Sequence, residues 1–300
     1  MKKPYIYSLI SILMWSTLAT SAKLLLDNFT NFQVLCVSSL IAAIVLLIMN
    51  IVSGKIKVLK NYKLMDWIKT ILAGIPGIFL YHIFYYAGAD ILPASQAFII
   101  NYLWPVMSII FACILLKEKM TIRKAVALLV SFAGVILVTG SGISEVGGLF
   151  ASGAIFCSLG AVSYGLFTVL NQMISYDKCI SMMINFAVSF ILAGIVVVAK
   201  DGVFMPNGTQ LLGLLWNGII TLAVPNTLWI IALEKRDTAK ISNLAYITPF
   251  VSLIWARLIL KEELRPACIF GLVIIVLGIF IQLKDRRNTV KSNNLNSTSR

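Results

Sequence analysis

The sequence predicts an all-α integral membrane protein with ten transmembrane helices, arranged as two inverted five-helix repeats. Hydrophobic residues make up 59% of its 300 residues and charged residues only 12%, whereas about 25% of the residues in a soluble domain are charged. The mean hydropathy is +0.93, and a water-soluble fold could not bury that much apolar surface. In addition, a repeat with an offset of 144 residues relates the two halves of the chain.

Apolar runs recur along nearly the whole chain, each close to the length of about 20 residues that crosses the hydrocarbon core as a helix. Barrel strands would be about half as long and more polar, so helices are expected. The predicted spans are residues 4–26, 31–53, 66–89, 93–115, 122–140, 148–174, 180–199, 209–233, 240–260 and 265–284. Residues 285–300 lack apolar periodicity, which predicts a disordered tail.

The distribution of charge predicts the orientation of the chain. The net charge is +13, and placing the N-terminus inside puts about 20 Lys and Arg on the inner side and about 5 elsewhere, which is the positive-inside bias. Basic loops of this kind suit anionic lipid headgroups, so the bilayer is the expected partner and nucleic acid is not. We expect a multi-pass protein of a bacterial cytoplasmic membrane with both termini in the cytoplasm. The oligomeric state stays open, and a monomer is compatible with the sequence.

Metal and cofactor chemistry is not expected. The chain has one histidine, His82, and five scattered cysteines without a C-x-x-C pair. Histidine-rich metal sites and a bis-histidine haem are therefore excluded. The cysteines are interpreted as small buried hydrophobic residues.

The internal repeat is clearest in spans four and nine. Eight of seventeen aligned positions are identical: Tyr102, Pro105, Ser108, Ile110, Ala112, Leu116, Lys117 and Glu118 match Tyr246, Pro249, Ser252, Ile254, Ala256, Leu260, Lys261 and Glu262. The same offset pairs Gly134 with Gly278. Each repeat holds an odd number of spans, so the halves, residues 1–140 and 141–284, must have opposite orientations. Inverted repeats are typical of secondary transporters, whose substrate site lies between the halves.

Each copy has a Pro, an apolar run and a Glu thirteen residues after the Pro, from Pro105 to Glu118 and from Pro249 to Glu262, followed by a Gly-centred apolar helix. This pattern resembles the EamA repeat of the drug/metabolite transporter superfamily over essentially all ten spans. The resemblance implies a secondary transporter that works by alternating access.

A narrower resemblance is to the YddG-like aromatic amino-acid exporters. It rests on Tyr81, His82, Tyr85 and Tyr86, followed by the string at residues 101–105. The resemblance implies aromatic or large neutral amino acids as cargo. Members of the family differ widely in substrate.

Four prolines within spans are candidates for helix breaks or gating: Pro76, Pro105, Pro225 and Pro249. A proline inside a helix frees the carbonyl four residues earlier, which for the second and fourth prolines belongs to Asn101 and Ala245. Freed backbone groups within a membrane need protein or a water-filled cavity as a partner. One central cavity is therefore expected, and passive kinks filled by neighbouring side chains are the alternative.

The candidate substrate-binding residues are polar or aromatic: Tyr81, His82, Tyr85, Asn101, Tyr102, Trp104, Tyr164, Asn226, Trp229 and Tyr246. Trp15 is a further aromatic contributor from span one. An interfacial aromatic belt is the alternative for the Tyr and Trp residues, and a structural hydrogen bond is the alternative for His82. Aromatic walls with a few polar groups suit a small solute with polar ends, such as an amino acid or an amine.

Energy coupling is inferred from the acidic residues. All twelve lie at predicted span ends or in loops, whereas ion-driven carriers commonly place a carboxylate at the midplane. Facilitated diffusion or exchange is the simplest mechanism, and His82 is the candidate proton carrier within a span.

The sequence thus predicts a secondary transporter of a small metabolite, most simply an amino acid exporter or facilitator. The alternative is a transporter of another metabolite, an amine or a drug, with or without proton coupling. A membrane-embedded enzyme is a distant alternative, because the chain has no H-E-x-x-H or G-x-S-x-G motif.

Overall fold

The computed structural model describes residues 3–146, 148–174, 176–202, 204–234 and 244–297, and these residues are helical or lie in short connections. Within these described ranges, eight helices are long and apolar enough to cross a membrane. Two shorter apolar helices, Ala245–Ile259 and Pro266–Ile281, follow them. The predicted all-helical membrane class is confirmed, and the two shorter helices lie where spans nine and ten are expected. Residues 240–243 of predicted span nine lie outside the described residues.

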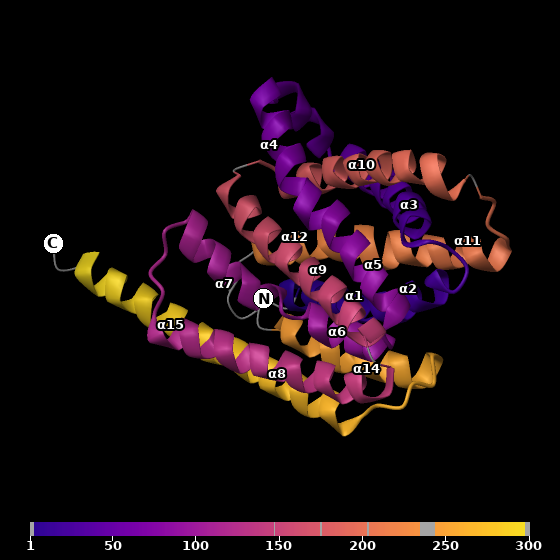
Figure 1. Cartoon of the computed structure of the whole chain (residues 1–300). Helices are drawn as coiled ribbons and strands as arrows, with labels where there is room; N and C mark the ends of the chain where they lie inside the picture. The colour runs from indigo at the N-terminus through magenta and orange to yellow at the C-terminus, as the bar shows by residue number, and fades with distance from the viewer. Residues whose placement is uncertain (1–2, 147, 175, 203, 235–243, 298–300) are drawn as a thin grey trace.

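The first half of the chain contains ten helical elements, several of which join into one span (Figure 1). They are α1 (Lys3–Ser16) and α2 (Leu18–Leu26), α3 (Asn31–Val52), η1 (Lys55–Asn61), α4 (Leu64–Gly74), η2 (Ile75–Leu80) and α5 (Tyr81–Ile91), α6 (Ala94–Asn101) and α7 (Trp104–Leu115), and α8 (Ile122–Val146).

The described elements of the second half follow a similar order. They are α9 (Gly148–Met173), α10 (Lys178–Val196) with η3 (Val197–Asp201), α11 (Gly208–Leu215), η4 (Trp216–Ala223) and α12 (Val224–Glu234), η5 (Ala245–Ile247) with α14 (Thr248–Ile259), and α15 (Pro266–Ser297).

Local structure repeats at the 144-residue offset. The N–H of Lys63 donates to the Asp66 carboxylate at the start of α4, and the N–H of Asn207 donates to the Gln210 side chain at the start of α11. Each cap satisfies a backbone donor that a helix start leaves free.

The same offset relates two left-handed residues. Lys117 and Lys261, with φ of 55° and 56°, are the non-glycine residues with positive φ in the described part of the chain. Each follows the end of a helix, α7 or α14. Each turns the next N–H back to a helix carbonyl, from Glu118 to Ala112 and from Glu262 to Ala256. The left-handed conformation costs a lysine about 1 kcal/mol of conformational energy. Contacts made by the neighbouring residues must therefore hold the turn in both halves.

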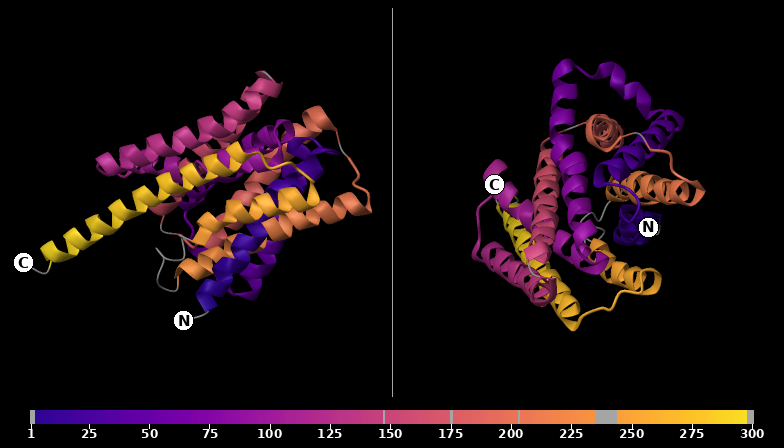
Figure 2. Two further views of the ribbon diagram at one scale, coloured as in Figure 1. Left: turned by 90° about the horizontal axis from the view of Figure 1, so that it is seen from below. Right: turned by 45° about the vertical axis from the view of Figure 1, so that its right-hand side comes forward.

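Equivalent helices of the two halves pack against each other, α8 against α15 and α3 against α10. The contact of α5 with α9 is likewise the equivalent of the contact of α12 with α1. The views agree that α8 and α15 lie side by side along one edge of the molecule (Figures 1 and 2). Their contact is reciprocal. A Cβ at Gly134 would lie 2.7 Å from the Gly271 carbonyl oxygen, and one at Gly278 would lie 2.8 Å from the Ala127 carbonyl oxygen.

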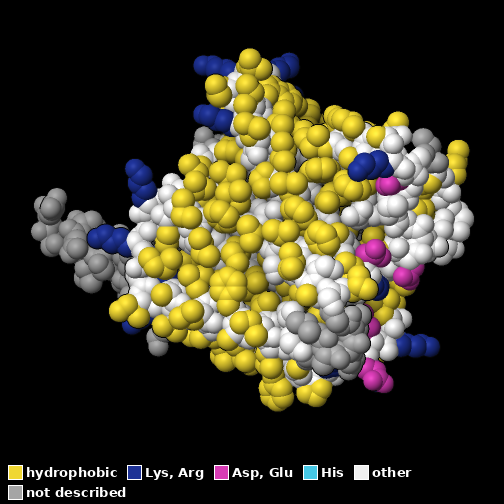
Figure 3. All heavy atoms as spheres, in the orientation of Figure 1, with side chains coloured by type: hydrophobic (Ala, Val, Ile, Leu, Met, Phe, Trp, Pro, Cys, Tyr) yellow, Lys and Arg dark blue, Asp and Glu magenta, His cyan; other side chains and the backbone are white. Residues whose placement is uncertain are grey.

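Large apolar side chains cover the outside of the bundle, as expected of a surface that faces lipid. Examples are Leu129 of α8 at 71% exposure, Ile195 of α10 at 61% and Leu258 of α14 at 66%. In Figure 3 hydrophobic side chains cover most of the visible face, with acidic groups gathered at the right margin and several basic groups at the upper and left margins.

Helix α15 continues to Ser297, beyond the predicted end of the last span at 284. Its end projects away from the other helices (Figure 2). The disorder that the sequence predicts for residues 285–300 stays a prediction. Extending an existing helix needs no new nucleation, so a helix can propagate past its packed part.

Replacing Gly278 by Ala should destabilise the protein. The new methyl group meets backbone atoms of α8, which cannot move aside as a flexible side chain can, and overpacking of this kind costs about 1–3 kcal/mol. The thermal unfolding midpoint of the detergent-purified variant should therefore fall. Gly140→Ala is the matched control, because no atom lies within 4 Å of a Cβ there. Equal midpoints for the two variants would contradict the close contact of α8 with α15.

Candidate functional site

A cavity of about 210 Å³ lies inside the bundle, lined by residues from both halves of the chain. Nine of the ten sequence-predicted binding residues line it: Tyr81, His82, Asn101, Tyr102, Trp104, Tyr164, Asn226, Trp229 and Tyr246. Residues from α5, α7, α9 and α12 thus meet around one space. Trp15 of α1 joins them.

Tyr85, the tenth predicted residue, does not line the cavity. It is fully buried in the hydrophobic core beside Tyr81, with ring centroids 6.0 Å apart. Residues four apart share a face of a helix, but each residue also rises 1.5 Å along the axis. Tyr85 therefore lies one turn beyond the cavity.

The four predicted prolines lie at irregular turns of the helices, and none of them is in the cavity wall. Pro76 lies in the π-helical η2, and Pro225 follows the π-helical η4 as the second residue of α12. Pro105 and Pro249 are the second residues of α7 and α14. Spans three and eight are thus continuous helices with a π-helical turn beside the proline, whereas spans four and nine are interrupted just before theirs.

One freed carbonyl has the kind of partner that the sequence predicts it to need. The Tyr102 hydroxyl donates to the carbonyl oxygen of Ala245, the group that Pro249 leaves without its helical partner. This bond connects the break in the fourth span with the break in the ninth. The two breaks therefore meet at the cavity.

Aromatic rings form two groups around the cavity. Trp104 contacts Tyr164 edge-on at 5.2 Å between ring centroids, Tyr164 contacts Tyr81 at 4.8 Å, and Tyr81 contacts His82 at 4.6 Å. Trp15 and Trp229 pair separately at 5.3 Å. These distances are typical of attractive aromatic pairs, and the rings hold one another in fixed positions.

The polar side chains of the cavity are anchored within the protein. The Asn101 side-chain amide donates to the Tyr81 hydroxyl at 3.0 Å. The His82 Nδ1 donates to the Ile78 carbonyl at 2.7 Å, and the Asn226 side-chain nitrogen donates to the Leu222 carbonyl. Among the described residues the cavity lining contains no Asp, Glu, Lys or Arg. The site can offer neutral hydrogen bonds and ring faces to a ligand.

Sequence reasoning missed the apolar and small members of the lining: Leu18, Ile78, Phe98, Met182, Phe186, Thr221, Leu222, Ala245 and Thr248. Apolar residues within apolar spans carry no distinguishing signal. A usable signal existed for Ala245, whose carbonyl Pro249 frees, and for Ile78 and Leu222, which precede His82 and Asn226 by one helical turn.

A larger cavity of about 810 Å³ lies elsewhere, between α1, α2, α11, η4 and α14. It contains none of the predicted binding residues. Leu24, Leu212 and Trp216 line it and are 48%, 67% and 48% exposed. The larger space is therefore a groove on the lipid-facing side, and the smaller interior cavity is the candidate site.

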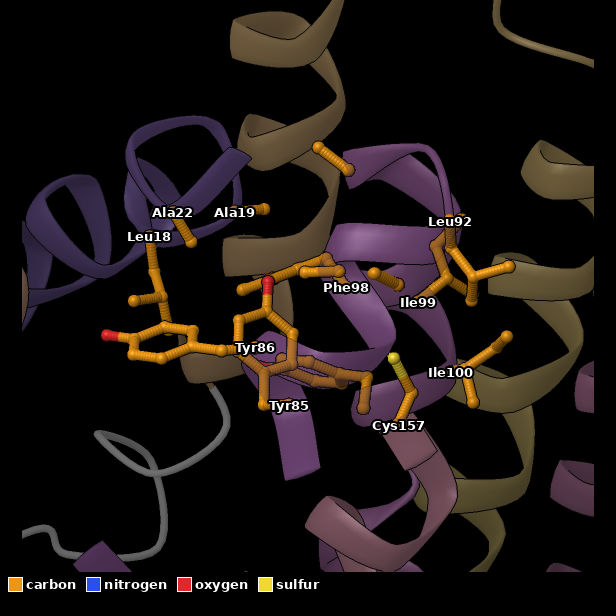
Figure 4. Close-up of a cluster of buried hydrophobic side chains, with 14 of the residues drawn as sticks. Leu18, Ala19, Ala22, Tyr85, Tyr86, Leu92, Phe98, Ile99, Ile100 and Cys157 are labelled. Carbon is orange, nitrogen blue, oxygen red and sulfur yellow. The ribbon is translucent and has the colours of Figure 1, made fainter. Parts of the chain in front are cut away.

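One end of the bundle is closed by a cluster of buried side chains. Leu18, Ala19 and Ala22 of α2 lie on one side of the cluster, Leu92 and Ile100 lie on the other, and Tyr86 and Phe98 lie between them (Figure 4). All seven are 8% exposed or less.

Two charged side chains bind backbone groups at this closed end. Lys23 donates to the carbonyls of Ala89, Asp90 and Leu92 at the end of α5. The Glu262 carboxylate accepts from the N–H groups of Ala94 at 2.6 Å and Ser95 at 3.1 Å. A cation at a helix C-terminus and an anion at an N-terminus also match the helix dipoles.

Comparison with known proteins identifies relatives along the whole chain. An uncharacterized transporter of Clostridium kluyveri is 29% identical to this chain, and the alignment covers 98% of this chain and 96% of the relative. An uncharacterized transporter of Archaeoglobus fulgidus is 25% identical, over 76% of this chain and 81% of its own. The aromatic amino acid exporter YddG of Ancylobacter novellus is a distant relative, 22% identical over 60% of this chain and 63% of its own.

A protein of known crystal structure has the same fold, with a TM-score of 0.68 and 21% identity over 96% of this chain and 99% of that one. The model of the EamA-like transporter family matches twice, at residues 2–140 and 151–283. These matches confirm a transporter rather than an enzyme. The chain is a multi-pass membrane protein that belongs to the EamA-like transporter family.

Proposed function

We propose that the chain moves an amino acid, aromatic or large and neutral, across the bacterial cytoplasmic membrane by export or facilitated diffusion. The observation that carries the proposal is the convergence of nine polar and aromatic candidates on one uncharged interior cavity. A volume of about 210 Å³ lies below the range of about 300–1,000 Å³ for drug-sized ligands. A small solute with an apolar side chain suits this space.

We further propose two inverted repeats, residues 1–140 and 141–284, with residues 285–300 as a cytoplasmic tail. The two family matches support this division, as do the equivalent caps, the equivalent left-handed lysines and the reciprocal contact of α8 with α15. Alternating access follows if one half rocks against the other around the cavity. The four prolines are the proposed gating elements.

The positive-inside bias orients the bundle with both termini in the cytoplasm. The end closed by Lys23 and Glu262 is then the outer end. The Glu262 contact joins the loop after α14 to the start of α6, so it ties the second half to the first. We propose that it holds the outer gate shut and breaks when the cavity opens outward.

Transport assays with proteoliposomes test the cargo. Radiolabelled phenylalanine and methionine should equilibrate into vesicles that contain the protein, with no accumulation driven by a pH gradient, because no carboxylate of the described residues lines the cavity. Movement of a lipophilic cation alone, or of none of the three, would reject the amino-acid cargo. Gradient-driven accumulation that His82→Gln abolishes would instead support the proton-coupled alternative.

Trp104→Ala should reduce phenylalanine transport at least about tenfold, because the variant removes an aromatic ring from the cavity wall, and a tenfold loss of affinity corresponds to about 1.4 kcal/mol of ligand contact. Expression and the unfolding midpoint should remain close to the parent values. Trp216→Ala, in the lipid-facing groove, is the matched control and should transport normally. A variant that loses folded protein rather than transport would favour a packing role for Trp104.

Glu262→Gln should loosen the closed end, because an amide offers only one acceptor oxygen to the two N–H groups. Losing a hydrogen bond to a charged group costs about 1.5–3 kcal/mol, or roughly tenfold or more in the open population. Cys157, fully buried in the cluster at this end, should react correspondingly faster with a maleimide, as measured by peptide mass spectrometry. Glu263→Gln is the control. If both variants label at the parent rate, Glu262 does not hold this gate.

A further inference from the structure

His82 and Asn226 occupy equivalent positions in the two halves, since their numbers differ by the repeat offset of 144. Each is anchored in the same way. The ring of His82 bonds the carbonyl of Ile78, and the amide of Asn226 bonds the carbonyl of Leu222, in each case four residues earlier. These carbonyls lie in the π-helical segments η2 and η4, and π-helical turns frequently occur at functional sites.

The anchors determine which atoms remain for a ligand. A carbonyl oxygen can only accept, so Nδ1 of His82 carries the proton and Nε2 of the neutral ring is an acceptor. The nitrogen of Asn226 faces its carbonyl, which leaves Oδ1 as an acceptor. Neither atom has a hydrogen-bond partner in the described part of the chain. Neither is among the atoms that are fully buried without a partner, so both remain accessible. Both residues line the cavity, and we infer that both acceptors are directed into it.

The surroundings of this acceptor pair favour a cation. Trp229 lies one turn from Asn226 and pairs with Trp15, and Tyr81 contacts His82. Ring faces carry negative charge density and attract ammonium groups. No Lys or Arg lines the cavity among the described residues, so a carboxylate could receive only neutral N–H and O–H groups there, and the lone pairs of the two acceptors would repel it.

We propose that the site recognises its cargo through a primary ammonium group, which donates to Nε2 of His82 and Oδ1 of Asn226 while its apolar part packs against the aromatic rings. The inference rests on the proposed function and makes it more specific. The ligand class is an aromatic or large apolar primary amine, and amino acids belong to it through their ammonium end. The carboxylate contributes little to affinity.

Ligand binding to the detergent-purified chain tests this directly, with quenching of tryptophan fluorescence as the readout. The probes share one aromatic ring: 2-phenylethylamine, phenylalanine, 3-phenylpropionate and the N,N,N-trimethyl derivative of 2-phenylethylamine. The first two should bind within about threefold of each other. The acid and the quaternary amine should bind at least tenfold more weakly, because one lacks the cation and the other lacks N–H donors.

Variants of Asn226 distinguish the loss of the acceptor atom from a loss of folded protein. Asn226→Leu should weaken 2-phenylethylamine at least tenfold and leave 3-phenylpropionate unchanged. Asn226→His installs the residue of the equivalent position and should restore amine binding to within about threefold of the parent. The His variant provides a folded comparison if the Leu variant proves unstable.

The inference would be overturned if 3-phenylpropionate bound as tightly as 2-phenylethylamine. It would also be overturned if Asn226→Leu kept the parent affinity for 2-phenylethylamine. Equal binding of the quaternary amine would assign recognition to the rings alone and would also overturn the role of the acceptors. The transport assay fails or succeeds separately. Amine binding without amino-acid transport would reject the cargo and retain the ammonium site.

Discussion

Hydrocarbon offers no hydrogen bonds, and the structure of this protein depends on that constraint. Each backbone polar group within the bilayer needs a partner from the protein or from a cavity. Continuous helices meet the requirement, and the described residues depart from regular α-helix at the prolines of the third, fourth, eighth and ninth spans. These irregular turns meet at one interior cavity, where Tyr102 satisfies the carbonyl of Ala245. The breaks and the side chains that repair them thus form the cavity's polar surface.

The rest of the bundle forms a rigid frame around that cavity. Glycines let α8 and α15 approach to backbone contact. Asn217 of η4 is fully buried and uses all its hydrogen-bonding capacity, donating to Ser38 and Tyr86 and accepting from Ser21 and Thr221. A polar network that is fully satisfied rigidifies its surroundings. It joins α2, α3, α5 and η4, which border the closed end.

Charge serves different purposes at different depths. The described part of the cavity wall has no ionised side chain. At the closed end, Lys23 and Glu262 bind helix ends. At the opposite end, Lys55 pairs with Asp177 at 3.2 Å between their charged groups. Contacts at helix ends can break at modest cost, because water replaces the lost partner. This arrangement suits a carrier whose ends open in turn while its centre stays dry and neutral.

The sequence alone determined the membrane class, the approximate spans, the repeat and most of the cavity wall, because these properties depend on hydropathy over long windows and on rare polar residues in apolar helices. It could not place Tyr85, whose helical face was correct but whose depth along the axis was not. It also gave no sign of most apolar lining residues, such as Leu18, Phe98 and Met182. The tertiary structure alone decided which carbonyls anchor His82 and Asn226 and that Glu262 reaches α6, 168 residues away. Such features depend on contacts between distant helices, which local patterns of residues do not encode.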